Sequence, residues 1–101
     1  MSLELEWDPA KADESSREHG VTFEEAATVF GDPLARVFDD PEHSSDEPRE
    51  IIVGYSERQR LLLVWFTERS PRIRIISARP ATRGERQRHE QNAKKAAQGP
   101  S

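Results

Sequence analysis

Residues 61–66 read Leu61-Leu62-Leu63-Val64-Trp65-Phe66, and this apolar run decides the fold of the 101-residue chain. Side chains of a β-strand point alternately to its two faces, so a strand over 60–66 presents apolar side chains on both. A strand that is apolar on both faces belongs in the middle of a sheet, between two layers of structure. We therefore predict a central strand here, covered by helix on one face and by other structure on the opposite face.

Further strands are predicted on both sides of this run. Residues 49–55 and 72–79 have the apolar and β-branched content of strands, and only short polar connections separate them from 60–66. Connections of this length join antiparallel neighbours, so the three strands should form a meander. One more short strand is predicted at 34–38, followed by an acidic, turn-rich loop at 39–48.

The first part of the chain contains a strand and a helix with clear boundaries. Apolar and acidic residues alternate at 3–7, which indicates a half-buried strand. Asp8 is placed to cap a helix at 9–19 whose first residue is proline, and Gly20 follows its end.

Two capping boxes mark the starts of two more helices. Thr22 with Glu25 opens a helix that Gly31 ends, and Thr82 with Glu85 opens a helix that continues to about residue 98. The last helix has almost no large apolar residue, which is typical of a solvated tail or of a working surface.

The order of elements is strand, helix, helix, four strands, helix (β-α-α-β-β-β-β-α). This order indicates an α+β domain with a mostly antiparallel sheet and helices packed on one face. We expect residues 1–98 to form this single domain and residues 99–101 to be a disordered tail.

Charge is divided unevenly along the chain, although the formal net charge is only -4. Residues 1–50 carry a net charge of -11 and residues 51–101 a net charge of +7, and nine of the later bases are arginines. A basic surface of this kind suits a polyanion such as nucleic acid, or the charges simply solvate a small protein.

Several functional classes are disfavoured by composition. The chain has no cysteine, which excludes a disulfide scaffold and a thiolate metal site. Its three histidines fall in separate predicted elements, so we expect no metal and no cofactor. No apolar run approaches the ~18 residues of a membrane span and the start lacks a signal-peptide pattern, so we expect a cytoplasmic protein.

The arginines near the end of the predicted sheet are the strongest candidates for ligand binding. Strict alternation along 72–79 places Arg72 and Arg74 on one face with Ile76, and Ile73 and Ile75 on the other face with Arg79 at its far end. Arg83, Arg86 and Arg88 follow on the last helix. Several guanidinium groups around one corner suit phosphate binding.

Ordinary ion pairs are the alternative for these arginines. Arg72 and Arg74 would then pair with Glu4 and Glu6 on a neighbouring strand, and Arg79 with an acidic residue such as Glu85. In that case, Arg79 would only fasten the last helix.

The acidic loop contains a candidate for proton transfer. His43 lies among carboxylates, which favour its protonated form, and it can donate or accept a proton near neutral pH. The alternative is that His43 only braces the loop.

Five strings of the sequence resemble, in order and spacing, the BrnT family of type II toxin-antitoxin toxins. The strings are LEWDPAK at 5–11, HGVTFEEA at 19–26, FGDPL at 30–34, DPEHS at 40–44 and RIISAR at 74–79. The resemblance implies a RelE-like fold, ribonuclease activity that blocks translation, and a BrnA-type antitoxin with a ribbon-helix-helix part. A heterotetramer of two toxins with an antitoxin dimer is the expected assembly.

With this resemblance, we predict a metal-independent endoribonuclease. Arg79 is the predicted phosphate clamp with Arg49 and Arg83 beside it, and His43 or Glu85 the predicted group for proton transfer. Further RNA contacts are predicted for four basic residues: Arg74, Arg83, Arg86 and Lys11. The alternatives are a module that binds nucleic acid without cleaving it and a pure protein-interaction domain.

Overall fold

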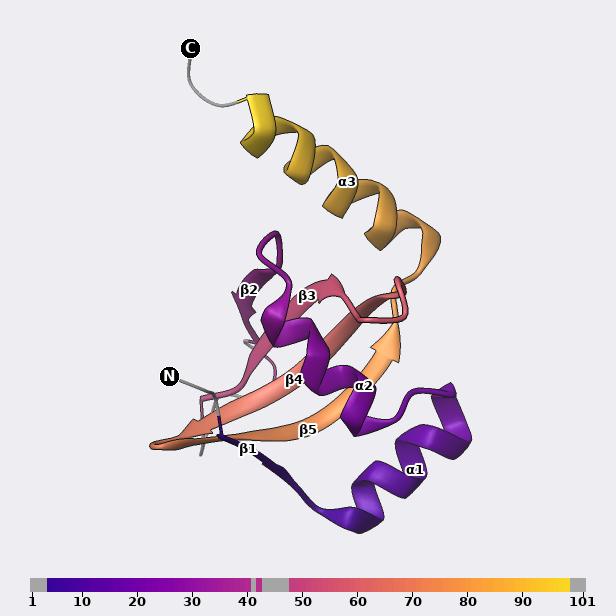
Figure 1. The fold of residues 1–101 in the computed structure, drawn as a ribbon, viewed down its shortest axis with the longest axis vertical. Helices are drawn as coiled ribbons and strands as arrows, with labels where there is room; N and C mark the ends of the chain where they lie inside the picture. Colours follow the sequence, from indigo (N-terminus) through magenta and orange to yellow (C-terminus); the bar gives the residue numbers. More distant parts are fainter. Residues whose placement is uncertain (1–3, 41, 43–47, 99–101) are drawn as a thin grey trace.

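The computed structural model describes residues 4–40, 42 and 48–98. His43 and the tail predicted at 99–101 therefore lie outside the described residues. A single five-stranded sheet forms the centre of the molecule (Figure 1). Its strands are β1 (Glu4–Trp7), β2 (Arg36–Asp39), β3 (Glu50–Tyr55), β4 (Leu61–Arg69) and β5 (Arg72–Pro80).

The sheet has the strand order β1-β5-β4-β3-β2, which places the apolar run of β4 in the middle, as predicted. Strands β2, β3, β4 and β5 pair antiparallel, and only β1 runs parallel to its neighbour β5. The predicted α+β class and the predicted order of elements are confirmed. No helix of the described residues is long and apolar enough to cross a membrane.

Two helices cover the first face of the sheet. They are α1 (Pro9–His19) and α2 (Phe23–Thr28), and α2 continues as a 3-10 turn, η1 (Val29–Gly31). The main core lies between them and the sheet, where Phe23, Leu62 and Val64 are completely buried. The side chains that β4 directs to this face therefore account for the packing of both helices.

The predicted caps form as local hydrogen bonds. Asp8 accepts a hydrogen bond from Ala10 N at 2.9 Å at the start of α1, and Gly20 ends this helix with a φ of 67°. Thr22 Oγ1 accepts from Glu25 N at 3.1 Å at the start of α2. A glycine is needed at position 20 because other residues rarely adopt this left-handed conformation.

The carboxylate of Glu25 does not complete its own capping box and joins three segments of the fold instead. It accepts hydrogen bonds from Ser56 Oγ at 2.7 Å and from Arg60 Nε at 2.9 Å, and Arg60 Nη2 also donates to Gly20 O at 2.9 Å. Glu25 is only 4% exposed. The hydrogen bonds from Arg60 are the main reason that the pKa of Glu25 lies below its usual value.

The last helix, α3 (Arg83–Gln98), lies apart from α1 and α2 and extends beyond the end of the sheet (Figure 1). A smaller cluster on the second face contains Val53, Leu61 and Leu63. The ring of His89 on α3 packs edge-on against Tyr55 of this face, with 5.8 Å between centroids. Because α3 carries so few apolar side chains, it does not cover the second face as α1 and α2 cover the first.

A β-bulge interrupts the alternation of side chains along β5. Trp65 pairs with Ser77 whereas Phe66 pairs with Ile75, so Ile76 is an extra residue between the two pairs. An extra residue reverses the phase of all side chains that follow it. The prediction that strict alternation separates Arg79 from Arg74 is therefore wrong, because the bulge returns Arg79 to the face of Arg74.

Candidate active site

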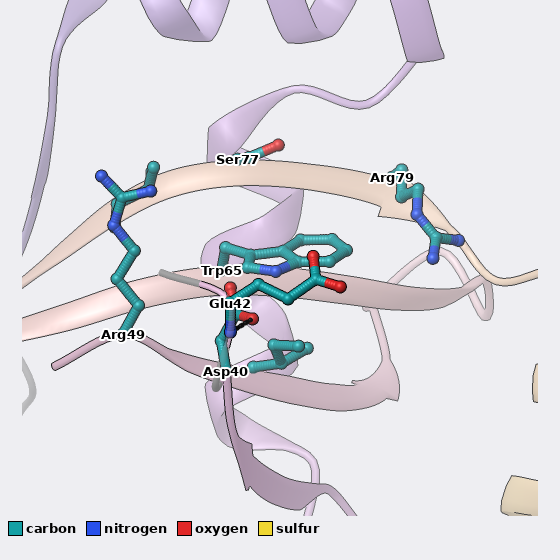
Figure 2. Close-up of a pocket in the computed structure, with 8 residues that line it drawn as sticks. Asp40, Glu42, Arg49, Trp65, Ser77 and Arg79 are labelled. Carbon is teal, nitrogen blue, oxygen red and sulfur yellow. Dashed lines mark hydrogen bonds between the residues drawn. The ribbon is translucent and has the colours of Figure 1, made fainter. Parts of the chain in front are cut away.

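An open cleft of about 570 Å³ lies on the second face of the sheet, which α1 and α2 do not cover. Strands β4 and β5 and the segments that flank the acidic loop supply its walls (Figure 2). The residues labelled there are Asp40, Glu42, Arg49, Trp65, Ser77 and Arg79. The cleft thus combines an aromatic ring with two guanidinium groups, two carboxylates and a hydroxyl group.

Arg79 reaches this cleft from the end of β5. Its Nη1 and Nη2 donate to the two carboxylate oxygens of Glu85, at 2.8 Å and 2.9 Å, and Nη1 also donates to Pro80 O at 3.1 Å. Its guanidinium carbon lies 5.4 Å from the centre of the Trp65 ring, within the range of a cation–π contact. The hydrogen bonds from Arg79 to Glu85 raise the pKa of the arginine.

Glu85 is held in place by the start of α3. Thr82 N donates to Glu85 Oε1 at 2.8 Å, and Thr82 Oγ1 accepts from Glu85 N at 3.2 Å, which completes the predicted capping box. Hydrogen bonds from Arg79, followed by those from Thr82, lower the pKa of Glu85 to about 2 despite partial burial. Glu85 is therefore ionised at neutral pH, and the predicted ion pair between Arg79 and Glu85 is present.

Arg49 lines the same cleft as Arg79. In Figure 2 the two guanidinium groups lie on opposite sides of the Trp65 ring. Arg49 is half-buried at the start of β3, and its carbonyl oxygen accepts a hydrogen bond from Asp40 N at 2.9 Å. The structure thus brings Arg49 into one cleft with Arg79, which is 30 residues further along the chain and is paired with the predicted site residue Glu85.

Arg72 and Arg74 form the ion pairs of the alternative interpretation. Glu4 pairs with Arg72 and Glu6 with Arg74 in the register of β1 and β5. Their closest charged atoms are 3.6 Å apart for Arg72 with Glu4 and 3.1 Å apart for Arg74 with Glu6. The charge of Arg74 is therefore balanced within the sheet.

The other predicted RNA-binding residues lie at the edges of this region. Lys11 lies on α1 and lines a smaller pocket of about 140 Å³, which shares Ile76 and Ser77 with the cleft. Arg83 and Arg86 are exposed on the first turns of α3. His43 lies outside the described residues, so its predicted role in proton transfer stays a prediction.

Sequence reasoning did not predict Asp40, Glu42, Trp65 or Ser77 as residues of the site, and Trp65 is the largest of them. The apolar run predicted that both faces of β4 are covered, but Trp65 is half-buried and lines an open cleft. This part of the prediction is wrong because α3 does not extend over the ring. The available signal was a tryptophan close to the polar end of this strand, which continues as Thr67-Glu68-Arg69.

A second hollow of about 320 Å³ separates α3 from the second face near β2. Phe38, Leu63 and His89 contribute to its lining, and Arg36 and Arg88 carry its positive charges. His89 is buried, and its Nε2 has no hydrogen-bond partner in the described part of the chain. Within residues 4–40, 42 and 48–98, no cluster of three or more histidine, aspartate or glutamate side chains could hold a metal ion.

Comparisons with known proteins identify a family and a fold. The model of a family described as "Ribonuclease toxin, BrnT, of type II toxin-antitoxin system" matches residues 7–85. The chain is similar in fold to the 1.1 Å crystal structure of the Brucella abortus ribonuclease toxin, BrnT, with a TM-score of 0.64 and 21% sequence identity. That match covers 81% of this chain and 100% of the Brucella chain. The comparison with curated proteins gives no match.

Proposed function

Because this chain belongs to the BrnT family of ribonuclease toxins of type II toxin-antitoxin systems, we propose that the cleft around Trp65 and Arg79 cleaves RNA without a metal ion. Cleavage of messenger or other cellular RNA then inhibits translation and growth. The observation that carries this proposal is the two-point contact of Arg79 with the carboxylate of Glu85, beside Arg49 in one open cleft. An arginine fork that holds a carboxylate in this way has the geometry to hold a phosphate.

The proposed reaction needs three kinds of group. A base takes the proton of the 2′-hydroxyl, cations hold the pentavalent phosphate, and an acid gives a proton to the leaving 5′-oxygen. The 2′-oxygen forms a bond to phosphorus while the bond from phosphorus to the 5′-oxygen breaks. The products are a 2′,3′-cyclic phosphate and a 5′-hydroxyl.

We assign the phosphate to Arg79, with Arg49 and Arg83 beside it. Glu85 is proposed as the base because it lies next to the clamp, and because a phosphate that takes its place on Arg79 removes the main cause of its lowered pKa and makes it a stronger base. His43 is the proposed source of the proton for the 5′-oxygen.

Four basic residues around the reacting phosphate are proposed to bind RNA: Lys11, Arg74, Arg83 and Arg86. Arg83 and Arg86 extend the positive surface along α3, and Lys11 extends it from α1 past the bulge of β5. Arg74 is proposed as a weaker contact, because Glu6 already balances its charge. Each exposed cation that meets a phosphate releases counterions, so the affinity should fall with salt.

Incubation of the purified protein with RNA in the presence of EDTA tests the activity. Cleavage that continues in EDTA, with cyclic-phosphate ends, supports the proposal. Binding without cleavage would instead support a nucleic-acid-binding module, and the absence of RNA affinity at low salt would support a protein-interaction domain.

A type II toxin acts with an antitoxin partner, and we propose a BrnA-type ribbon-helix-helix protein in a heterotetramer of two toxins and an antitoxin dimer. Three large apolar residues are exposed on or beside the edge strand β2: Leu34 is 58% exposed, Val37 51% and Phe38 45%. The nearby hollow below α3 carries Arg36 and Arg88. An amphipathic, acidic segment would bury the apolar side chains and pair with these arginines.

Co-expression with the product of the neighbouring gene tests this partner. We expect Phe38→Glu to reduce co-purification of the antitoxin while RNA cleavage continues. Elution of the unmodified toxin alone, with unchanged toxicity in the presence of the antitoxin, would contradict the proposal. We further propose that residues 1–98 act as one toxin domain and that the protein acts in the cytoplasm, where its RNA targets are.

A further inference from the structure

We propose that Trp65 is a stacking platform for one base of the RNA substrate, with Arg49 and Arg79 as contacts to the phosphates on either side of that base. This inference rests on the proposed ribonuclease function and adds to it a subsite that orients the strand. In this arrangement, Trp65 is a positioning residue that holds the nucleotide next to the clamp.

The exposure of Trp65 differs from that of its neighbours on the same strand face. Leu61 is 1% exposed and Leu63 is 6% exposed, whereas Trp65 is half-buried and lines the open cleft. The indole is thus the one member of this apolar row that is left partly open to solvent. Trp65 packs against the cluster of Val53, Leu61 and Leu63 with part of its surface, and the exposed remainder of the ring is available to bind a ligand.

The surroundings of the ring fit a nucleotide. Arg49 and Arg79 lie on opposite sides of Trp65 (Figure 2), and the hydroxyl-bearing Ser77 is its cross-strand partner. Proteins bind single-stranded nucleic acid by combining cations that contact the backbone with aromatic rings on which bases stack. The cleft contains both kinds of group.

The contact between Arg79 and Trp65 shows that the ring can be approached by charged groups. The guanidinium carbon lies 5.4 Å from the ring centre while both terminal nitrogens bind Glu85. If a phosphate replaces the Glu85 carboxylate on this fork, the attached nucleoside lies beside the indole. We therefore place a base on Trp65 and its phosphate on Arg79.

An apolar protein segment would be the competing ligand for an exposed indole. The cleft carries Asp40, Glu42, Arg49 and Arg79 around the ring, whereas the exposed aliphatic and phenyl side chains lie elsewhere, at Leu34 and on β2. These charged groups disfavour an apolar segment, and the two guanidinium groups beside one aromatic platform suit a nucleotide.

The two tryptophans of the chain make a direct test possible. Trp7 packs edge-on against Phe23 on the first face, with 6.0 Å between ring centroids, so it lies away from the cleft. In Trp7→Phe, Trp65 is the only source of indole fluorescence. In Trp65→Phe, Trp7 is the only source and acts as the matched control.

Each single-tryptophan variant is titrated at low salt with a short 2′-O-methyl oligoribonucleotide, which cannot be cleaved because it lacks the attacking hydroxyl. We expect the oligonucleotide to quench Trp7→Phe and to leave the emission of Trp65→Phe unchanged, with both variants binding it. Trp65→Leu should bind about tenfold more weakly than Trp65→Phe, because leucine has no ring for stacking. Circular dichroism shows whether the leucine variant is folded.

The outcomes separate this inference from the proposed function. Binding to Trp7→Phe without quenching, no binding at all, or equal affinities of folded Trp65→Leu and Trp65→Phe would each overturn the base platform. Quenching of the Trp65 fluorescence by the antitoxin, with no quenching by the oligonucleotide, would also overturn the base platform. The ribonuclease function has its own readout, which is cleavage of unmodified RNA by the wild-type protein in EDTA.

Discussion

Both carboxylate oxygens of Glu85 accept hydrogen bonds from the guanidinium of Arg79, at 2.8 Å and 2.9 Å. A phosphate offers the same pair of acceptors to an arginine. In the proposed mechanism the scissile phosphate takes the place of the Glu85 carboxylate on this fork, and the displacement leaves an ionised carboxylate beside the reacting group. Arg79 fastens the start of α3 in the free protein and is proposed to bind phosphate during cleavage.

Replacement of this arginine tests the proposed clamp. Arg79→Ala should slow RNA cleavage about a hundredfold or more, because it removes a contact that stabilises the transition state. Arg79→Lys should cleave RNA little faster than Arg79→Ala, since a single ammonium group cannot reproduce the two-point fork. Initial rates of cleavage in EDTA and growth arrest on induction measure both effects.

The stability of the same variants separates a functional role from a structural one. Two further variants serve for comparison. Glu85→Gln removes the charge of the partner of Arg79 and keeps the arginine itself. Arg72→Ala is the control, because it removes an exposed arginine that pairs with Glu4. The proposed clamp predicts that Arg79→Ala loses far more activity than its melting temperature explains. A loss of activity in proportion to the loss of thermal stability would show that Arg79 only fastens α3.

The ion pair also predicts how stability depends on pH. The hydrogen bonds from Arg79 lower the pKa of Glu85 from 4.5 to about 2 in the folded protein. A carboxylate with a lowered pKa contributes stability that is fully present above about pH 4.5 and is lost as the pH falls towards 2. The difference in melting temperature between wild type and Glu85→Gln should therefore shrink over this interval. A difference that is constant across it would contradict the assignment.

The buried carboxylate of Glu25 is expected to be important for stability. Glu25→Gln should lower the free energy of unfolding by about 1.5–3 kcal/mol, because it weakens charged hydrogen bonds with Arg60 and Ser56. The neighbouring Glu24 is exposed on the same helix, so Glu24→Gln is the matched control. Urea unfolding of the two variants measures the effect, and equal midpoints would show that the Glu25 contacts add nothing.

The salt dependence of RNA binding tests Arg49, the second cation of the cleft. The affinity for a non-cleavable oligonucleotide should fall as salt rises, and Arg49→Ala should reduce the slope of log affinity against log salt by about 0.7. Arg17→Ala is the control, because Arg17 is exposed on α1 and pairs with Asp13 at 3.3 Å. An unchanged slope in Arg49→Ala would remove this residue from the RNA contacts.

The sequence by itself determined the elements of this protein and their order. The strand at β4 follows from six successive apolar residues, and the starts of α1, α2 and α3 follow from Asp8, Thr22 and Thr82. These features are predictable because a cap or a run of apolar residues acts within one turn or one strand. The order of elements and the short connections then limit how the strands can pair.

Only the tertiary structure decided which side chains share the cleft. The extra residue Ile76 reverses the alternation along β5 and brings Arg79 to the face of Trp65, and a bulge is a property of two paired strands. Arg49 reaches the same cleft from the position before β3, and none of the described residues that line the cleft around Trp65 comes from α3. Local spacing contains no information on such non-local pairing, because register and docking depend on contacts between segments that are distant in the chain.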